Sequence, residues 1–236
     1  MLKDDDPLLM TSPFVRAIAK TLEYIDANDG IGLTKSGAFN RKFVEWAAVE
    51  FNWPDCTPEH LYRLNKVLDE WDVPPVSDIH DFLLAMKFGR HYKGKFKITK
   101  DGRKIIEHPS MVFNELVPNY LFRFDHGSNL RREEPLFGNW DIWLNVVNVE
   151  ADAGTSQGHI REVLYGKPED EGRFYDEIGS SLYIQVLRPL CWAGLLQTPE
   201  DSDKRFGNDK IFFKTDLWRK ALSLDTDVEL KAQPLQ

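Results

Sequence analysis

A short strand that runs directly into a helix N-cap is the feature that most restricts the fold of this chain. Residues 93–98 alternate between two kinds of side chain with a period of two, which is the pattern of a half-buried strand. One face would carry Lys93, Lys95 and Lys97, and the other Phe96 and Ile98. Thr99 follows, and its hydroxyl can cap a helix over residues 100–106. Because such a strand has to bury its apolar face against preceding helices, we expect a mainly helical fold with short β-hairpins.

Comparable junctions stand at three places in the chain. Each combines a strand end, a capping threonine and a helix start: Gly32-Leu33-Thr34-Lys35-Ser36-Gly37, Lys97-Ile98-Thr99-Lys100-Asp101-Gly102-Arg103 and Phe213-Lys214-Thr215-Asp216. The recurrence indicates a degenerate internal repeat. The alternative is that an apolar residue followed by Thr is a common way for any strand to enter a helix.

At the N-terminal end, the sequence predicts the order helix, strand, helix. An amphipathic helix is expected over residues 13–27, with Ser12 as its N-cap and a proline at its first position. Asn28-Asp29-Gly30 should end it, and residues 31–33 are expected to form a short strand. Thr34 is then expected to cap a helix that carries Phe39, Phe43, Trp46, Ala47 and Phe51.

The same order returns further along the chain. Thr57-Pro58-Glu59 predicts the start of a helix whose inward residues are Leu61, Leu64, Leu68 and Trp71. Pro74-Pro75 is expected to break this helix, and Ser77 to cap a second one that runs through Phe88 and is closed by Gly89. After the strand, His108-Pro109 predicts another helix to about residue 122.

A third run of elements follows an irregular linker. Residues 140–147 favour a helix, although their valines leave a strand as the alternative. Ser156 is expected to cap a helix through residue 165, and residues 178–193 to form a long helix bent by Pro189. A hairpin would join residues 195–196 to 211–213, and Thr215 would cap the helix over 216–222.

These elements predict a partial helix-strand-helix unit over residues 1–56, a unit of helices and a basic hairpin over 57–123 and a linker over 124–136. A second unit of helices and a hairpin, without the basic charge, is expected over 137–222, followed by a tail over 223–236. The start of the chain has three aspartates where a secretory signal would be basic and apolar, and residues 190–196, the longest apolar run, fall far short of the roughly 20 needed to cross a bilayer. We therefore expect a cytoplasmic protein with no membrane contact. Its two cysteines offer no disulfide framework.

Charge is distributed unevenly along the chain. The formal net charge is -8, yet residues 87–104 hold eight basic residues and a single carboxylate, Asp101, a net charge of +7 that leaves -15 for the rest. The negative net charge argues against a nonspecific nucleic-acid binder, because such a protein carries basic residues over most of its surface. The basic segment is therefore the sharpest functional signal in the sequence.

No motif of catalysis, cofactor binding or metal binding is complete. Gly32 and Gly37 have the spacing of a phosphate-binding loop, but Ala38 and Phe39 stand where Lys and Ser or Thr are required. The six histidines show no i, i+4 pairing that would present metal ligands on one face: His60, His80, His91, His108, His126 and His159. We expect no cofactor, no metal and no enzyme, with a site assembled from distant residues as the remaining alternative.

Helices followed by a two-stranded hairpin are the order of a winged-helix unit. The stretch Gly30 to Phe122, with its segments GIGLTKSG and KFKITKDGRKIIEHPSMVF, resembles tandem winged-helix regions of uncharacterised bacterial, often plasmid-associated, proteins. The resemblance covers about half of the chain. It implies a winged-helix fold and a bacterial source, and it carries over no catalytic residues.

The basic hairpin is the candidate nucleic-acid-binding site. A wing commonly touches DNA in winged-helix proteins, and seven residues could contact phosphates: Arg90, Lys93, Lys95, Lys97, Lys100, Arg103 and Lys104. Against DNA stands the helix over 77–88, because Asp78 and Asp81 would repel phosphate. The leading expectation is a non-enzymatic regulator that binds duplex DNA. The alternative is a scaffold that pairs with another protein or with itself.

Overall fold

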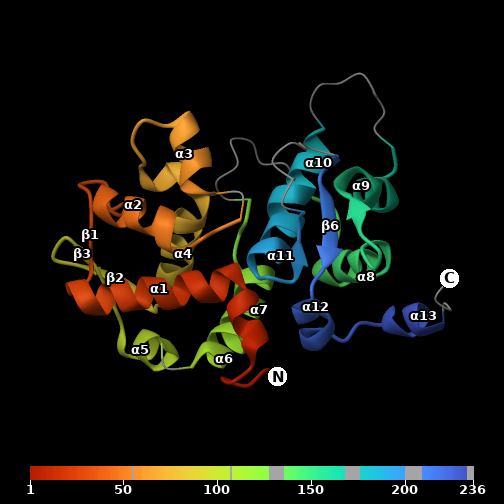
Figure 1. Cartoon of the computed structure of the whole chain (residues 1–236), viewed down its shortest axis with the longest axis horizontal. Helices are drawn as coiled ribbons and strands as arrows, with labels where there is room; N and C mark the ends of the chain where they lie inside the picture. Colours follow the sequence, from red (N-terminus) through yellow and green to blue (C-terminus); the bar gives the residue numbers. More distant parts are fainter. Residues whose placement is uncertain (55, 107, 128–135, 168–175, 200–208, 233–236) are drawn as a thin grey trace. The chain divides into compact units, whose positions relative to one another are not determined.

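The computed structural model describes residues 1–54, 56–106, 108–127, 136–167, 176–199 and 209–232 (Figure 1). The chain divides into two compact units, Met1–Tyr120 (unit 1) and Leu121–Gln236 (unit 2). Within the described part of the chain, no helix combines the length and the apolar character that crossing a membrane requires.

Unit 1 is organised around the long helix α1 (Pro13–Asn28), which follows the short helix η1 (Pro7–Thr11). The Ser12 hydroxyl accepts a hydrogen bond from the N–H of Val15, and Asp29 ends the helix in the left-handed conformation, at φ 55°. Both predicted ends are therefore confirmed. The apolar stripe is buried as its spacing predicts: Phe14, Ile18, Leu22 and Ile25.

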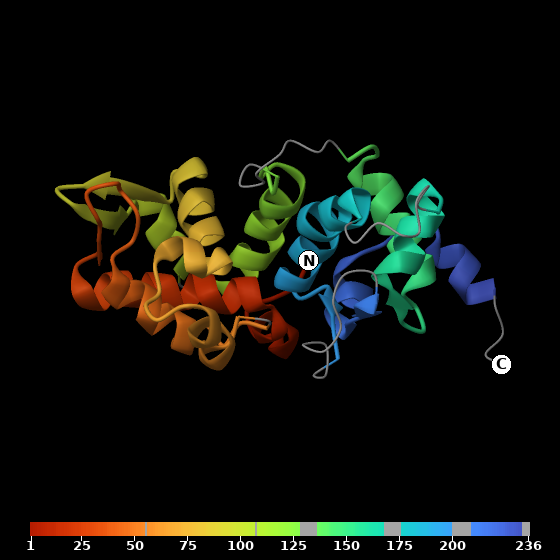
Figure 2. The ribbon, with the colours of Figure 1, turned by 90° about the horizontal axis from the view of Figure 1, so that it is seen from above.

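A three-stranded antiparallel sheet closes unit 1. Its strands are β1 (Ile31–Gly32), β2 (Gly89–Tyr92) and β3 (Lys95–Ile98), in the order β1-β3-β2. Ile31 lies opposite Phe96, so the sheet joins strands from both sides of residue 56, and the segments before and after that residue form one compact unit. The hairpin β2–β3 extends away from the helices of unit 1 (yellow in Figure 2).

The helix that follows β1 begins later than expected. Helix α2 covers Arg41–Glu50, and its N-cap is Asn40, whose side chain accepts from the N–H of Phe43. Thr34 instead closes a turn, in which its N–H donates to Ala38 O and its carbonyl accepts from Gly37 N–H. The predicted cap at Thr34 is wrong, and the first of the three junctions is a loop and not a helix start.

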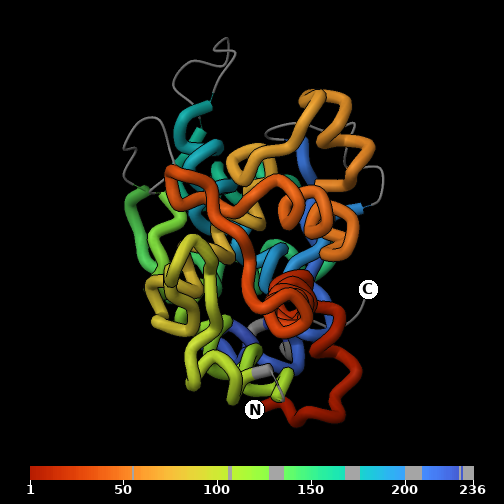
Figure 3. The backbone as a smooth tube through the Cα atoms, turned by 90° about the vertical axis from the view of Figure 1, so that its left-hand side faces the viewer, coloured from red at the N-terminus to blue at the C-terminus, as the bar shows by residue number. Residues whose placement is uncertain are grey.

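The segment between α2 and the hairpin also differs from expectation. Helix α3 covers Pro58–Leu64 with Thr57 as N-cap, and a short helix η2 covers Glu70–Asp72. Leu61 and Leu68 are buried, but Leu64 and Trp71, expected to point inward, are each 69% exposed. In Figure 3, which looks along α1, the orange segment with α2 and α3 and the yellow hairpin lie on different sides of α1.

Pro74 and Pro75, which were expected to break a helix, stand at the first two positions of one. Helix α4 covers Pro74–Ala85, and Ser77 is a buried residue inside it, so the predicted cap at Ser77 is wrong. Proline is favourable in the first helical turn, because the N–H that it lacks would have no partner there.

Helices follow the sheet as predicted. Helix α5 covers Lys100–Ile106, and a helical region then runs through α6 (Pro109–Met111), the π turn η3 (Val112–Leu116) and α7 (Val117–Phe122). Pro118 comes two residues after this π turn. A wider turn is a common response to a proline, which cannot donate to the helical ladder.

Unit 2 repeats the strand order of unit 1. Its elements are α8 (Trp140–Glu150), β4 (Thr155–Ser156), α9 (Gln157–Tyr165), α10 (Glu177–Leu182), the π turn η4 (Tyr183–Leu187), α11 (Arg188–Trp192), β5 (Leu196–Gln197), β6 (Ile211–Lys214), α12 (Asp216–Ala221) and α13 (Asp227–Ala232). The sheet order is β4-β6-β5. Residues 140–147 are helical, which excludes the strand alternative, and the expected disruption at Pro189 takes the form of the π turn that precedes it.

Two of the three threonine junctions are equivalent. The hydroxyls of Thr99 and Thr215 donate to Lys87 O and Gly194 O at 2.9 and 2.7 Å, and both hydroxyls also accept the N–H of the residue three positions later. Lys87 and Gly194 both have positive φ, 59° and 81°. The internal repeat is therefore present at the end of the third strand of each sheet.

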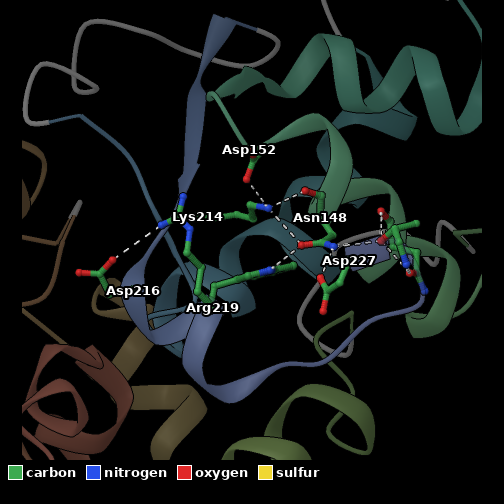
Figure 4. Close-up of polar contacts among 9 residues, drawn as sticks. Asn148, Asp152, Lys214, Asp216, Arg219 and Asp227 are labelled. Carbon is green, nitrogen blue, oxygen red and sulfur yellow. Dashed lines mark hydrogen bonds and ion pairs between the residues drawn. The ribbon is translucent and has the colours of Figure 1, made fainter. Parts of the chain in front are cut away.

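A buried polar network ties the last elements of unit 2 together (Figure 4). The Lys214 side chain is 3% exposed, and its Nζ lies 2.8 Å from Asp152 Oδ1 and donates to Asn148 O at 2.7 Å. Asn148 Oδ1 accepts from Lys214 Nζ and from Trp218 Nε1, and Asn148 Nδ2 donates to Asp227 Oδ1 at 2.9 Å. One asparagine thus connects α8 with β6, α12 and the start of α13.

We expect the substitution Asn148→Ala to destabilise unit 2 by about 2–4 kcal/mol, because it leaves Trp218 Nε1 and part of the Lys214 ammonium without acceptors in a buried site. Denaturant unfolding followed by tryptophan fluorescence measures the loss. Asn119→Ala is the control, because Asn119 donates to Glu115 O at the surface. Equal stability of the two variants would contradict the role given to Asn148.

Candidate nucleic-acid interface

The seven basic residues singled out in the sequence lie on three consecutive elements of unit 1. Arg90 is in β2 and Lys93 is in the hairpin turn, Lys95 and Lys97 are in β3, and the other three are in α5: Lys100, Arg103 and Lys104. These seven residues are called the basic hairpin surface below.

The strand register sorts the hairpin into two faces. Arg90 lies opposite Lys97 and Tyr92 opposite Lys95, so these four side chains share the outer face. His91 lies opposite Phe96 on the inner face, where Phe96 and Ile98 are buried. The predicted alternation is confirmed from residue 95 onward.

Lys93 does not belong to the strand. It and Gly94 form the two-residue turn, with φ of 49° and 73°. Positive φ at both central positions matches the twist of a tight hairpin. The expected lysine face therefore consists of Lys95 and Lys97, and Lys93 stands at the tip.

The hairpin is seated on the rest of unit 1 by close packing around one glycine. A Cβ atom at Gly89 would lie 1.8 Å from the ring of Phe96, so no other residue fits there without moving the ring. Phe96 is fully buried and packs edge-on against Phe39, with ring centroids 5.2 Å apart. Packing of Phe96 on the inner face therefore fixes the position of the hairpin, and with it the position of the basic side chains on the outer face.

Carboxylates at the C-terminal end of α1 neutralise part of the basic hairpin surface. Asp29 pairs with Lys95 at 3.3 Å and with Lys97, and Lys97 Nζ also donates to the carbonyl of Asp29 at 2.6 Å. The hydrogen bond from Lys97, followed by that from Lys95, lowers the pKa of the Asp29 carboxyl. Asp26, one turn earlier in α1, pairs with Arg103 at 2.5 Å.

Three cations have no carboxylate partner among the described residues: Arg90, Lys93 and Lys100. Arg90 and Lys93 instead lie 5.4 and 5.3 Å from the ring centroid of Tyr92, which is half exposed. Lys104 pairs with Asp101 at 2.8 Å. Seven cations therefore face three carboxylates, which leaves a local net charge of +4.

The helix that was expected to repel phosphate presents fewer carboxylates than its sequence suggested. In α4, Asp78 and His80 are buried, and Asp78 accepts a hydrogen bond from Tyr120. Of the two aspartates of α4, only Asp81 is exposed. The interpretation that two carboxylates of this helix face the ligand is wrong, because the helix turns Asp78 into the core.

Two histidines with no recognisable pairing in the sequence, His80 and His91, are in contact. His80 Nε2 and His91 Nε2 lie 2.9 Å apart, and His80 Nδ1 lies 2.7 Å from Glu70 Oε1. The three residues come from α4, β2 and η2, so no spacing within one element could have revealed them. Among the described residues, no group of His, Cys, Asp and Glu is arranged to hold a metal ion.

Unit 2 offers a weaker candidate surface. Tyr183 and Arg188 are half buried. Lys210 Nζ donates to the Tyr183 hydroxyl at 3.1 Å, and Arg188 lies 4.6 Å from the Trp192 ring centroid. The acidic loop residues of the second hairpin lie outside the described residues: Glu200, Asp201 and Asp203.

Comparison with known proteins covers both units. Residues 10–111 match the family model of the Y4jL N-terminal domain, and residues 130–216 match that of the y4jL C-terminal domain. The chain is 36% identical over 165 residues to the uncharacterized protein y4jL of the bacterium Sinorhizobium fredii (strain NBRC 101917 / NGR234), which covers 70% of this chain and 75% of that protein. No solved structure matches the chain.

Proposed function

The chain belongs to the Y4jL family, and from that premise we propose that it is a non-enzymatic, cytoplasmic regulator whose unit 1 is a winged-helix domain that binds duplex DNA. The contact is made by the basic hairpin surface. Lysine and arginine side chains that neutralise phosphates supply most of the sequence-independent affinity of such proteins.

Topology supports the winged-helix assignment. Each unit runs from a helix through a strand and then through further helices into an antiparallel hairpin, with α2, α3, η2 and α4 in unit 1 and α9 and the α10–η4–α11 region in unit 2. In each sheet the third strand lies between the first and the second. In unit 1, α4 precedes the hairpin in the position of a recognition helix. A hairpin next to such a helix can track the phosphate backbone while the helix approaches the major groove.

Charge concentration is the observation that carries the proposal. The whole chain has a formal net charge of -8, but the basic hairpin surface keeps a net charge of +4 after its ion pairs are counted. A local positive field on an acidic protein steers a polyanion to one place on its surface.

We expect the triple substitution of Arg90, Lys93 and Lys100 by Glu to weaken duplex binding by roughly 10–100-fold at moderate salt and to lower the salt slope by about 2–3. These cations have no carboxylate partner among the described residues, so the fold should persist. Fluorescence anisotropy over a salt series measures both quantities. The matched control replaces three exposed lysines elsewhere: Lys3, Lys66 and Lys220. Equal loss in both triple variants would sink the proposal.

Asp29→Asn should strengthen duplex binding, by roughly 3–10-fold, because it removes the carboxylate that competes with phosphate for Lys95 and Lys97. Asparagine tolerates the left-handed conformation of residue 29 at least as well as aspartate does. Anisotropy at constant salt measures the change. Asp225→Asn, which removes an equal charge from unit 2, should leave affinity nearly unchanged, and an equal gain there would show that total charge alone matters.

A scaffold function is the second candidate, and one surface favours it. Four large apolar side chains are exposed in the segment 62–71, which runs from the end of α3 into η2: Tyr62, Leu64, Val67 and Trp71. Large apolar side chains that are exposed close together on a surface commonly mark protein contacts.

If this surface pairs two copies of the chain, light scattering at micromolar concentration should give about twice the monomer mass of 27.4 kDa. The double substitution Leu64→Glu and Trp71→Glu should restore the monomer. Val163→Glu, at another exposed apolar position, is the control. A monomer in all samples rules out self-pairing.

A further inference from the structure

Three hydrogen-bonded side chains connect the hairpin to the helices of unit 1. Glu70 Oε1 lies 2.7 Å from His80 Nδ1, and His80 Nε2 lies 2.9 Å from His91 Nε2. The second oxygen of Glu70 accepts the backbone N–H of Phe39. Glu70 and His80 are buried, whereas His91 belongs to strand β2 and reaches the surface. The chain of bonds therefore runs from the interior to the hairpin.

Aromatic packing fixes the middle ring of this chain. His80 stacks on Phe39 with ring centroids 3.9 Å apart and meets the edge of Phe96 at 5.3 Å. A buried imidazole held in this way cannot turn to find other partners. Each of its nitrogens must therefore be satisfied by the group that it faces, which is Glu70 on one side and His91 on the other.

Counting protons shows how many charges the histidine pair can hold. The carboxylate of Glu70 accepts, so His80 Nδ1 carries a proton. Only one proton fits between the two facing Nε2 atoms. With that bond intact, the pair accommodates a single positive charge. A second would turn two N–H groups toward each other at 2.9 Å, and the bond would break.

The groups around His91 make the second proton costly. Burial, followed by the charge of His80, lowers the pKa of His91, and Glu70 opposes them. From α4 the exposed Asp81 lies close enough to interact with both His80 and Glu70. On β3 the neighbour of His91 is the apolar Phe96, and Gly37 in the turn before α2 also lies beside the His91 ring. Arg90 lies on the opposite, outer face of the hairpin.

Acid should weaken the contact between His91 and His80. A histidine whose folded pKa lies below its unfolded value of about 6.5 binds more protons when its surroundings open. Its contribution to hairpin stability is complete above that value and is lost as the pH falls through the lowered pKa. Mild acid is therefore the condition that loosens the contact.

We propose that Glu70, His80 and His91 form a proton-operated latch: while the histidine pair carries at most one positive charge, the hydrogen bond between the two Nε2 atoms holds strand β2 against α4, and a second proton, which makes both histidines cationic, releases the hairpin from the helices. The latch belongs to the free protein and does not depend on DNA binding. It controls whether the outer face of the hairpin is held as one rigid surface.

Amide hydrogen exchange of the intact chain, followed by NMR, tests the latch. Protection factors, corrected for intrinsic exchange rates, are measured for β2 and β3 at about pH 7.5 and about pH 5. Protection in the hairpin should fall on the order of ten-fold or more at the lower pH, the factor that a charge-assisted hydrogen bond supplies. Strand β6 of unit 2 should keep its protection.

The variant His91→Gln separates the latch from general acid effects. The glutamine amide can donate to Nε2 of neutral His80 or accept the Nε2–H of protonated His80, and it does not titrate, so hairpin protection should no longer depend on pH. His159→Gln, at an exposed histidine of unit 2, should behave as the original chain. The imidazole signals of the original chain, titrated by NMR, give a readout that needs no variant. The proposal is overturned if both histidines become protonated while hairpin protection stays constant, or if the acid loss persists in His91→Gln.

Discussion

The pairing of β1 with β3 is the contact on which unit 1 depends. Only two residues of β1 take part, but Ile31 meets Phe96 across 65 positions of the chain, and this brings the hairpin to the C-terminal end of α1. Asp29 then lies beside Lys95 and Lys97, and Phe96 reaches the aromatic group around Phe39. The charge balance of the outer face and the position of His91 on the inner face both follow from this one alignment.

Local chemistry explains which parts of the fold could be predicted from the sequence. The caps at Ser12, Thr57, Thr99, Ser156 and Thr215 are bonds between a side chain and a backbone N–H three residues later. Such bonds lie within one stretch of sequence, so residue type and spacing are enough to find them. Thr34 has the same local pattern but is closed into a turn, because Asn40 supplies the cap nearer to the helix.

Long-range contacts explain what was missed. The basic residues of 90–104 could be found by counting charge, but their partners Asp26 and Asp29 lie on a helix more than sixty residues earlier. His80 and His91 meet because α4 and β2 are adjacent elements that turn toward each other. Burial of Asp78 depends on how α4 rotates against the core, which its sequence of mixed apolar and polar residues does not specify.

The end of α1 gives Lys95 and Lys97 a second physical role. The carbonyl groups at a helix C-terminus carry the negative pole of its macrodipole, and Lys97 Nζ donates to the carbonyl of Asp29 while both lysines pair with its side chain. These two cations therefore compensate a partial charge of the backbone as well as a carboxylate. A basic residue at position 95 or 97 would therefore stabilise the end of α1 even in a related protein that no longer binds any ligand through this surface.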